Sequence, residues 1–147
     1  MQRRDALVGA GAIAMAALVN RALAEEHQHD HAHMHGDNKY QALIDAAGAC
    51  VQKGQACVAH CNKLLGEGDK DMWECQSTAM QTLAICSALQ ELGNLHSPQL
   101  AKVAAAASEI CKACQVECRK HEDKHASCKE CGEACAACAK QCDALAV

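Results

Sequence analysis

The segment "CKECGEACAACAKQC", residues 128–142, carries five cysteines in fifteen positions. Successive cysteines are three, four, three and four residues apart. Because an α-helix turns 100° per residue, this spacing places all five thiols within an arc of about 80° on one helical face. Such a stripe is typical of the buried face of a helix that packs against other helices.

The remaining cysteines fall into three further groups that follow the same rule. Within each group the thiols lie within about 60° of one another on a helix. In chain order the groups are Cys50, Cys57 and Cys61; Cys75 and Cys86; and Cys111, Cys114 and Cys118. Each of four predicted helices therefore carries its cysteines on a single stripe.

Turn and capping signals divide the chain after residue 38 into four helices, which we expect at 39–65, 71–92, 97–120 and 125–145. Gly66 and Gly93 are the expected stops of the first two helices, and Asp71 is the expected N-cap of the second. Ser97 and Pro98 suit the N-cap and the first position of the third. Short links between the helices predict an all-α fold, an antiparallel up-down four-helix bundle with a cysteine-lined core.

The composition predicts a thin apolar core. The chain of 147 residues suits one modest domain, has no Phe, one Trp and one Tyr, and is poor in Leu, Ile and Val. Ordinary apolar residues extend the cysteine stripes: Leu43, Leu64, Leu89, Leu100, Ala104 and Ala107. A core built largely of Ala and Cys needs additional stabilisation. The net charge of −4 and the scarcity of aromatic residues argue against nucleic-acid binding.

Residues 1–24, "MQRRDALVGAGAIAMAALVNRALA", have the pattern of an export signal that is cleaved. Arg3 and Arg4 precede an apolar run, and Ala22 and Ala24 form a small-residue cleavage site. The paired arginines favour the twin-arginine route, which would deliver the protein to the periplasm or the lumen of intracytoplasmic membranes. The apolar run is too short and too rich in Gly and Ala for a membrane anchor, and we expect no membrane insertion of the mature chain.

Residues 25–38, "EEHQHDHAHMHGDN", alternate histidine with other residues. We expect a flexible N-terminal segment before the four-helix-bundle domain at 39–147. Alternating imidazoles suit Cu(II), Zn(II) or Ni(II), and a low-complexity solvated arm is the alternative.

Thirteen inward-facing thiols allow three interpretations: inert core residues, a disulfide scaffold, or metal ligands. Inert packing would use Val or Ala without the risk of oxidation. A disulfide scaffold suits an exported protein, but the odd number of cysteines and the wide i, i+4 separation on a helix oppose it. Metal binding is favoured, with the ligands Cys50, Cys57, Cys61, Cys75, Cys86, Cys111, Cys114, Cys118, Cys128, Cys131, Cys135, Cys138 and Cys142.

Charge favours Cu(I) among the soft ions that thiolates select. Each four-thiolate zinc site would bury about two negative charges, and the stripes contain no cation to offset them. One Cu(I) per bridging thiolate leaves the core near neutral. So many equivalent sites suit storage of multiple ions, not catalysis. A disulfide-stapled scaffold and a metallothionein-like zinc or copper detoxification protein remain the alternatives.

His60 and Met72 lie near the end of the bundle at which the first and third links meet. At this open end an imidazole and a thioether suit the passage of Cu(I) toward the thiols. Ordinary packing of Met72 and solvation of His60 are the alternatives. We expect His121 and His125, in the charged third link, to face solvent.

The whole chain resembles the bacterial four-helix-bundle copper storage proteins, in particular the exported members from methane-oxidising bacteria. The matching segments are "ACVQKGQACVAHC", "GEGDKDMWEC", "CKACQVEC" and "CKECGEACAACAKQC". The resemblance implies Cu(I) held by paired thiolates, His60 and Met72 at the open end, a homotetramer, and supply of copper to a copper-dependent enzyme. Leu64 and Glu67 stand where this resemblance leads one to expect further methionines.

Overall fold

The computed structural model describes residues 38–145, and the predicted export signal and nearly all of the predicted histidine-rich segment lie outside this range. The described part contains four long helices, one short 3-10 helix and no strand. In chain order these are α2 (Gln41–Gly66), η1 (Lys70–Met72), α3 (Trp73–Asn94), α4 (Leu100–Arg119) and α5 (Ala126–Leu145). None of these helices is long and apolar enough to cross a lipid bilayer.

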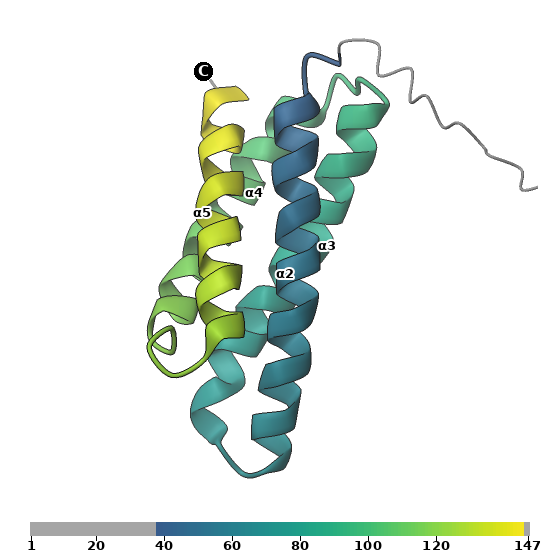
Figure 1. Ribbon diagram of the computed structural model, residues 1–147. Coiled ribbons are helices and arrows are strands. Elements are labelled where there is room, and N and C mark those ends of the chain that lie inside the picture. The colour runs from purple at the N-terminus through teal and green to yellow at the C-terminus, as the bar shows by residue number, and fades with distance from the viewer. Residues whose placement is uncertain (1–37, 146–147) are drawn as a thin grey trace, which may run out of the picture. The chain divides into compact units, whose positions relative to one another are not determined.

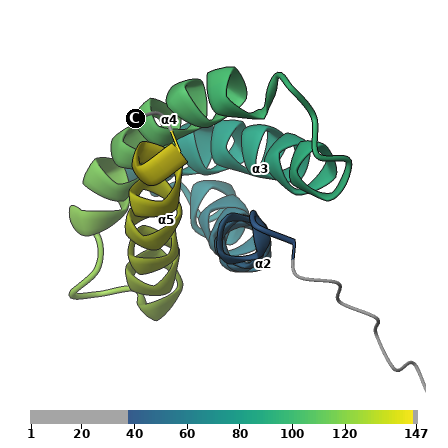
Figure 2. The same cartoon turned by 90° about the horizontal axis from the view of Figure 1, so that it is seen from above.

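The four helices form an antiparallel up-down bundle, as predicted (Figure 1). Helices adjacent in sequence are adjacent in space, and α5 closes the bundle by packing against α2 (Figure 2). The α2–α3 and α4–α5 links therefore share one end, which we call the open end. The α3–α4 link lies at the opposite end, together with the start of α2 and the end of α5.

Burial follows the predicted stripes. All thirteen cysteine side chains have no exposed surface. The end opposite the open end is closed by ordinary apolar residues, because Leu43, Leu89 and Leu100 are buried there and pack in the same cluster as the cysteines. Ala104 and Ala107 are buried as predicted, and Leu64 is partly buried against the cluster.

The predicted N-cap of the second helix was wrong. Asp69, not Asp71, caps this segment: its carboxylate accepts a hydrogen bond from the Asp71 backbone N–H at 3.2 Å. The chain then makes the single 3-10 turn η1 before α3 starts at Trp73. An extra turn moves the cap two residues toward the N-terminus, and the capping pattern alone did not distinguish the two aspartates.

Helix α2 ends at Gly66 as predicted, but α3 continues one residue past Gly93, which therefore is not its stop. Both glycines lie inside the last turn of their helices, and the left-handed backbone conformations fall at Gly68 (φ 97°) and His96 (φ 49°). Gly93 is instead a close-packing position, because a Cβ there would lie 2.8 Å from Cγ1 of Ile44.

The third helix begins slightly later than predicted. Ser97 and Pro98 lie in a turn that precedes α4, and the Ser97 hydroxyl accepts a hydrogen bond from the Gln99 backbone N–H at 3.2 Å. The Leu100 N–H bonds to the Ser97 carbonyl at 3.1 Å. Ser97 therefore caps a turn that leads into the helix, with Pro98 in a position that needs no N–H donor.

Candidate metal centre

The thirteen cysteines of the core are all free thiols. Neighbouring sulfurs lie between 3.5 Å, for Cys50 and Cys135, and 4.0 Å, for Cys114 and Cys131. These separations are far longer than the S–S bond of about 2.05 Å. They suit metal bridging, because two metal–sulfur bonds of about 2.3 Å span sulfurs up to about 4.6 Å apart.

The sulfurs gather into four groups in which all ligand atoms lie within 4.8 Å of one another. Two groups hold four sulfurs and two hold three. They are Cys50, Cys86, Cys111 and Cys138; Cys57, Cys61, Cys75 and Cys128; Cys57, Cys118 and Cys131; and Cys114, Cys131 and Cys135. Each sulfur group draws on at least two helices, which is how an up-down bundle converts four stripes into shared sites.

The groups are connected into a continuous row. Cys57 and Cys131 each belong to two groups, and the 3.5 Å contact between Cys50 and Cys135 joins the remaining pair. A sulfur that belongs to two groups is placed to bridge two ions. Cys142 is the one cysteine outside these groups, and the neighbouring Cys138 thiol raises its pKa.

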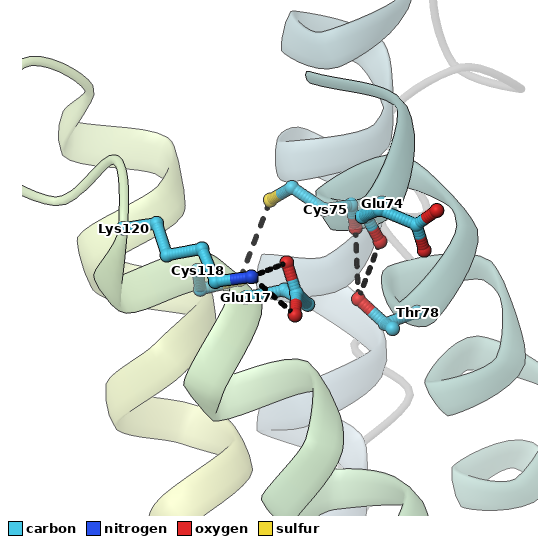
Figure 3. Close-up of polar contacts among 6 residues, drawn as sticks. All are labelled: Glu74, Cys75, Thr78, Glu117, Cys118 and Lys120. Atoms are coloured by element: carbon cyan, nitrogen blue, oxygen red, sulfur yellow. Dashed lines mark hydrogen bonds and ion pairs between the residues drawn. The ribbon is translucent and has the colours of Figure 1, made fainter. Parts of the chain in front are cut away.

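Figure 3 shows the contact that joins α3 to α4 in this row. The Cys75 and Cys118 sulfurs lie 3.7 Å apart, inside the bundle. Beside them, on the surface, Lys120 forms a 2.6 Å ion pair with Glu117. Thr78, one turn after Glu74, donates to the Glu74 and Cys75 backbone carbonyls.

The core around the thiols carries no positive charge. Among residues 38–145, the buried polar side chains are Gln76, Thr82 and Ser108, none of which ionises at neutral pH. Ion pairs such as Lys53 with Glu130 lie on the surface. A metal that leaves several uncompensated thiolate charges would therefore be costly to bury here.

Hydrogen bonds among the thiols lower the pKa of some cysteines and raise the pKa of others. Bonds from neighbouring thiols, that from Cys135 first, lower the pKa of Cys111 to about 5. The pKa of Cys128 is also lowered, chiefly by Cys57. The pKa of the donating thiols changes in the opposite direction, because the hydrogen bond to Cys111 raises the pKa of both Cys86 and Cys135. At neutral pH the row thus holds protons that a metal must displace.

The open end differs from the prediction. His121 and His125 are half-buried, not solvent-facing. The His125 ring lies 4.7 Å from the His60 ring and 6.4 Å from the His121 ring, measured between centroids. The reason is that the third link folds back over the end of α2, a tertiary contact that the charged sequence of the link does not reveal.

The two predicted non-cysteine ligands have distinct settings. Nε2 of His60 is buried and has no hydrogen-bond partner, so it is available to a ligand. Met72 is fully buried within the core cluster at the end of η1. His60 does not belong to the four sulfur groups.

Among the core positions that the sequence analysis did not identify, one is polar and unpaired. Thr82 is fully buried, and its hydroxyl has no hydrogen-bond partner. The signal was present, because Thr82 precedes Cys86 by four residues and so lies on the same helical stripe. A single threonine on a cysteine stripe does not by itself indicate a buried, unpaired hydroxyl.

Comparison with known proteins identifies the family. A family model described as "Copper storage protein" matches residues 36–147. An uncharacterised cysteine-rich protein, YhjQ of Bacillus subtilis, is 31% identical over 103 residues, which are 67% of this chain and 94% of that protein.

Solved structures are similar in the same region. The Cu(I)-bound copper storage protein BsCsp3 has a TM-score of 0.67 at 29% identity, covering 74% of this chain and 98% of its own. A cytosolic copper storage protein from Streptomyces lividans, with five coppers, has a TM-score of 0.66 at 27% identity, covering 72% and 90%. The family resemblance noted from the sequence motifs is confirmed.

Proposed function

This chain belongs to the copper storage protein family, and on that premise we propose that its bundle stores multiple Cu(I) ions on the row of cysteine thiolates. The observation that carries the proposal is the set of thirteen buried thiols, twelve of which form the continuous row, in a core that holds no cation among the described residues. Solved relatives described as Cu(I)-bound and as loaded with several coppers support it.

Bridging thiolates set the capacity at roughly one Cu(I) per cysteine. Each Cu(I) takes two thiolates and each thiolate contacts two ions, so the charges cancel along the row. Shared sulfurs such as Cys57 and Cys131 suit this pattern. A thiolate row that collects many equivalent ions is a reservoir, and we propose no catalytic role.

A competition experiment tests the choice of metal. The reduced protein is incubated without oxygen with equal amounts of Cu(I) and Zn(II), and the metal retained after gel filtration is measured. We expect nearly all of it to be copper. Retention of mainly zinc would favour the zinc detoxification alternative. A thiol count in denaturant without metal should find nearly thirteen free thiols, whereas about one would indicate the disulfide scaffold.

We propose that His60 and Met72 hand Cu(I) from solvent to the nearest sulfur group. The unpartnered Nε2 of His60 and the position of Met72 at the end of the η1 turn support this role. Met72→Leu keeps the apolar volume and removes the thioether sulfur. We expect slower copper uptake with unchanged capacity, measured by stopped-flow absorbance. An unchanged uptake rate in both Met72→Leu and His60→Ala would refute this role.

Export by the twin-arginine route stays a proposal. It is supported by Arg3 and Arg4, the apolar run and the small-residue cleavage pattern. The double substitution Arg3→Lys and Arg4→Lys should retain an uncleaved precursor in the cytoplasm, seen by cell fractionation and intact mass. Normal export of this variant would contradict the proposal.

We further propose that the stored copper supplies a copper-dependent enzyme, directly or through a chaperone, and that the chain forms a homotetramer. Light scattering after gel filtration tests the tetramer, and a monomeric mass would exclude it. Deletion of the protein should lower the activity of copper enzymes when copper is withdrawn from the medium. Unchanged activity after withdrawal would point to detoxification.

A further inference from the structure

Thr82 is the buried polar residue of the core whose side chain makes no hydrogen bond within the described residues. It is fully buried on α3, and its hydroxyl oxygen has no hydrogen-bond partner. Burial of an unpaired hydroxyl costs free energy, and a partner that arrives in another state of the protein would offset that cost.

Two other hydroxyls on the same helix behave differently. Thr78 donates to the Glu74 carbonyl at 2.9 Å, and Ser87 donates to the Leu83 carbonyl at 2.8 Å. Figure 3 shows the Thr78 bond, which is the usual way a helical hydroxyl satisfies itself. Thr82 has the same option toward the carbonyl four residues earlier and does not take it. Its hydroxyl is therefore free for a partner within the core.

The register of the bundle identifies the sulfurs at the level of Thr82. On α4, Cys118 lies 3.7 Å from Cys75 and Cys111 lies 3.8 Å from Cys86. Because α3 and α4 are antiparallel, a position four residues before Cys86 lies level with Cys114, three residues after Cys111.

The register between α3 and α5 leads to the same sulfur group. It runs parallel to α3, and Cys138 lies 3.7 Å from Cys86. Four residues before Cys86 on α3 therefore corresponds to the turn of α5 that holds Cys135. Thr82 thus lies level with two members of the three-sulfur group formed by Cys114, Cys131 and Cys135.

This group lacks a sulfur from α3. In the group of Cys50, Cys86, Cys111 and Cys138, each of the four helices supplies one thiol. The group of Cys114, Cys131 and Cys135 draws only on α4 and α5. At this level the inward stripe of α3 carries Thr82 between Ala79 and Cys86. A hydroxyl thus occupies the place where α3 could have supplied a fourth sulfur.

We propose that the Thr82 hydroxyl donates a hydrogen bond to the copper-bound thiolates of the Cys114–Cys131–Cys135 group. The inference rests on the proposed storage of Cu(I). Thiolate sulfur bound to a metal keeps lone pairs and negative charge, and a hydroxyl donor stabilises it without becoming a ligand. Thr82 is then a positioning residue, whose hydroxyl is unpaired in the empty protein and paired in the loaded one.

The test is Thr82→Val, which removes the hydroxyl and keeps the shape. Without copper we expect the variant to be at least as stable as the unmodified chain in urea unfolding, because an unpaired buried hydroxyl is gone. In Cu(I) competition with a chromophoric chelator, we expect a fraction of the ions to be held about tenfold more weakly. Thr82→Ser should restore the affinity.

Controls separate this proposal from the storage function itself. Thr78→Val removes a hydroxyl that bonds only to backbone, and its copper affinity should not change. If the unmodified chain binds no more than two ions, the storage function fails. If it binds many ions and Thr82→Val holds them equally tightly, the role of Thr82 alone is refuted.

A second variant covers the case in which Thr82→Val does not fold. Thr82→Cys places a fourth sulfur at this level, and we expect the capacity for Cu(I) to rise by about one ion per chain. An unchanged capacity in this variant would mean that position 82 does not face the sulfurs, and it would overturn the proposal.

Discussion

Cysteine acts in this core both as a small buried side chain and as a soft ligand. Its volume lets four helices approach closely around Cys50, Cys86, Cys111 and Cys138, whose sulfurs meet within 4.8 Å. Larger residues would fill the space and separate the helices. The use of Cys where a bundle normally has Leu or Ile makes the apolar core weaker, and it also creates the row of sulfurs.

Glycine at two positions allows α2 and α3 to pack closely. A Cβ at Gly54 would lie 2.9 Å from Cδ2 of Leu83, and one at Gly93 would lie 2.8 Å from Cγ1 of Ile44. Gly66, in contrast, has open space around it. These differences give glycines of similar appearance in the sequence opposite roles in packing.

Gly93→Ala should destabilise the metal-free protein by about 1–3 kcal/mol, because the added methyl group forces the branched Ile44 side chain to move. Gly66→Ala is the matched control and should be neutral or stabilising by up to about 1 kcal/mol through higher helix propensity. Urea unfolding of the two reduced variants, followed by circular dichroism, measures both. Equal destabilisation in the two would contradict the close packing at Gly93.

Individual residue roles were the part that the sequence predicted least well. The cysteine stripes are periodic, so their common orientation follows from helix geometry alone. The half-buried positions of His121 and His125 depend on how the third link folds over α2, and the unpaired hydroxyl of Thr82 depends on packing among four helices. The link contact leaves no periodic signal, and the position of Thr82 on the cysteine stripe indicates its burial but not its missing hydrogen-bond partner.

The predicted ends of the four helices lie within three residues of the observed ends, but the residues that cap them were not all predicted correctly. Gly, Asp and Ser residues cluster at each link, so several assignments satisfy the capping rules. At the start of α3, Asp69 and Asp71 both fit, and the 3-10 turn η1 selects Asp69.

Asp69→Ala should therefore cost more stability than Asp71→Ala. Loss of the hydrogen bond that the Asp71 N–H donates to the Asp69 carboxylate is expected to cost about 0.5–2 kcal/mol. Asp71→Ala loses only a favourable charge near the helix start, about 0.3–1 kcal/mol. Thermal unfolding of the metal-free variants gives the comparison, and a larger loss for Asp71→Ala would restore the original assignment.

At the scale of the whole molecule, fold class and thiol placement were both confirmed because they share one cause. A single periodicity directs the stripes of four helices inward, and short links force neighbours to be antiparallel. The resulting tube is apolar at the end of Leu43, Leu89 and Leu100 and thiol-lined toward the open end. Metal loading would join the helices across the part of the core that is poorest in apolar contacts.

Copper binding should release protons near pH 7, but fewer than one per ion. Thiols such as Cys86 and Cys135 have raised pKa values, so they remain protonated until copper displaces their protons. The pKa values of Cys111, Cys114, Cys128, Cys131 and Cys138 are lowered, and a thiol of this set that has already lost its proton releases none, so the total falls clearly below one per ion. Copper affinity should accordingly rise with pH. A pH-stat titration measures the released protons, and a value near zero would indicate binding to neutral imidazole or thioether groups.

The central claim is that the thiol row holds copper as a reservoir, and anaerobic titration of the fully reduced protein with Cu(I) tests it most directly. Bound copper is measured after gel filtration at each ratio of added ion to protein. We predict saturation near thirteen ions per chain, one for each cysteine. Saturation at one or two ions would contradict storage and identify the protein as a carrier of single ions.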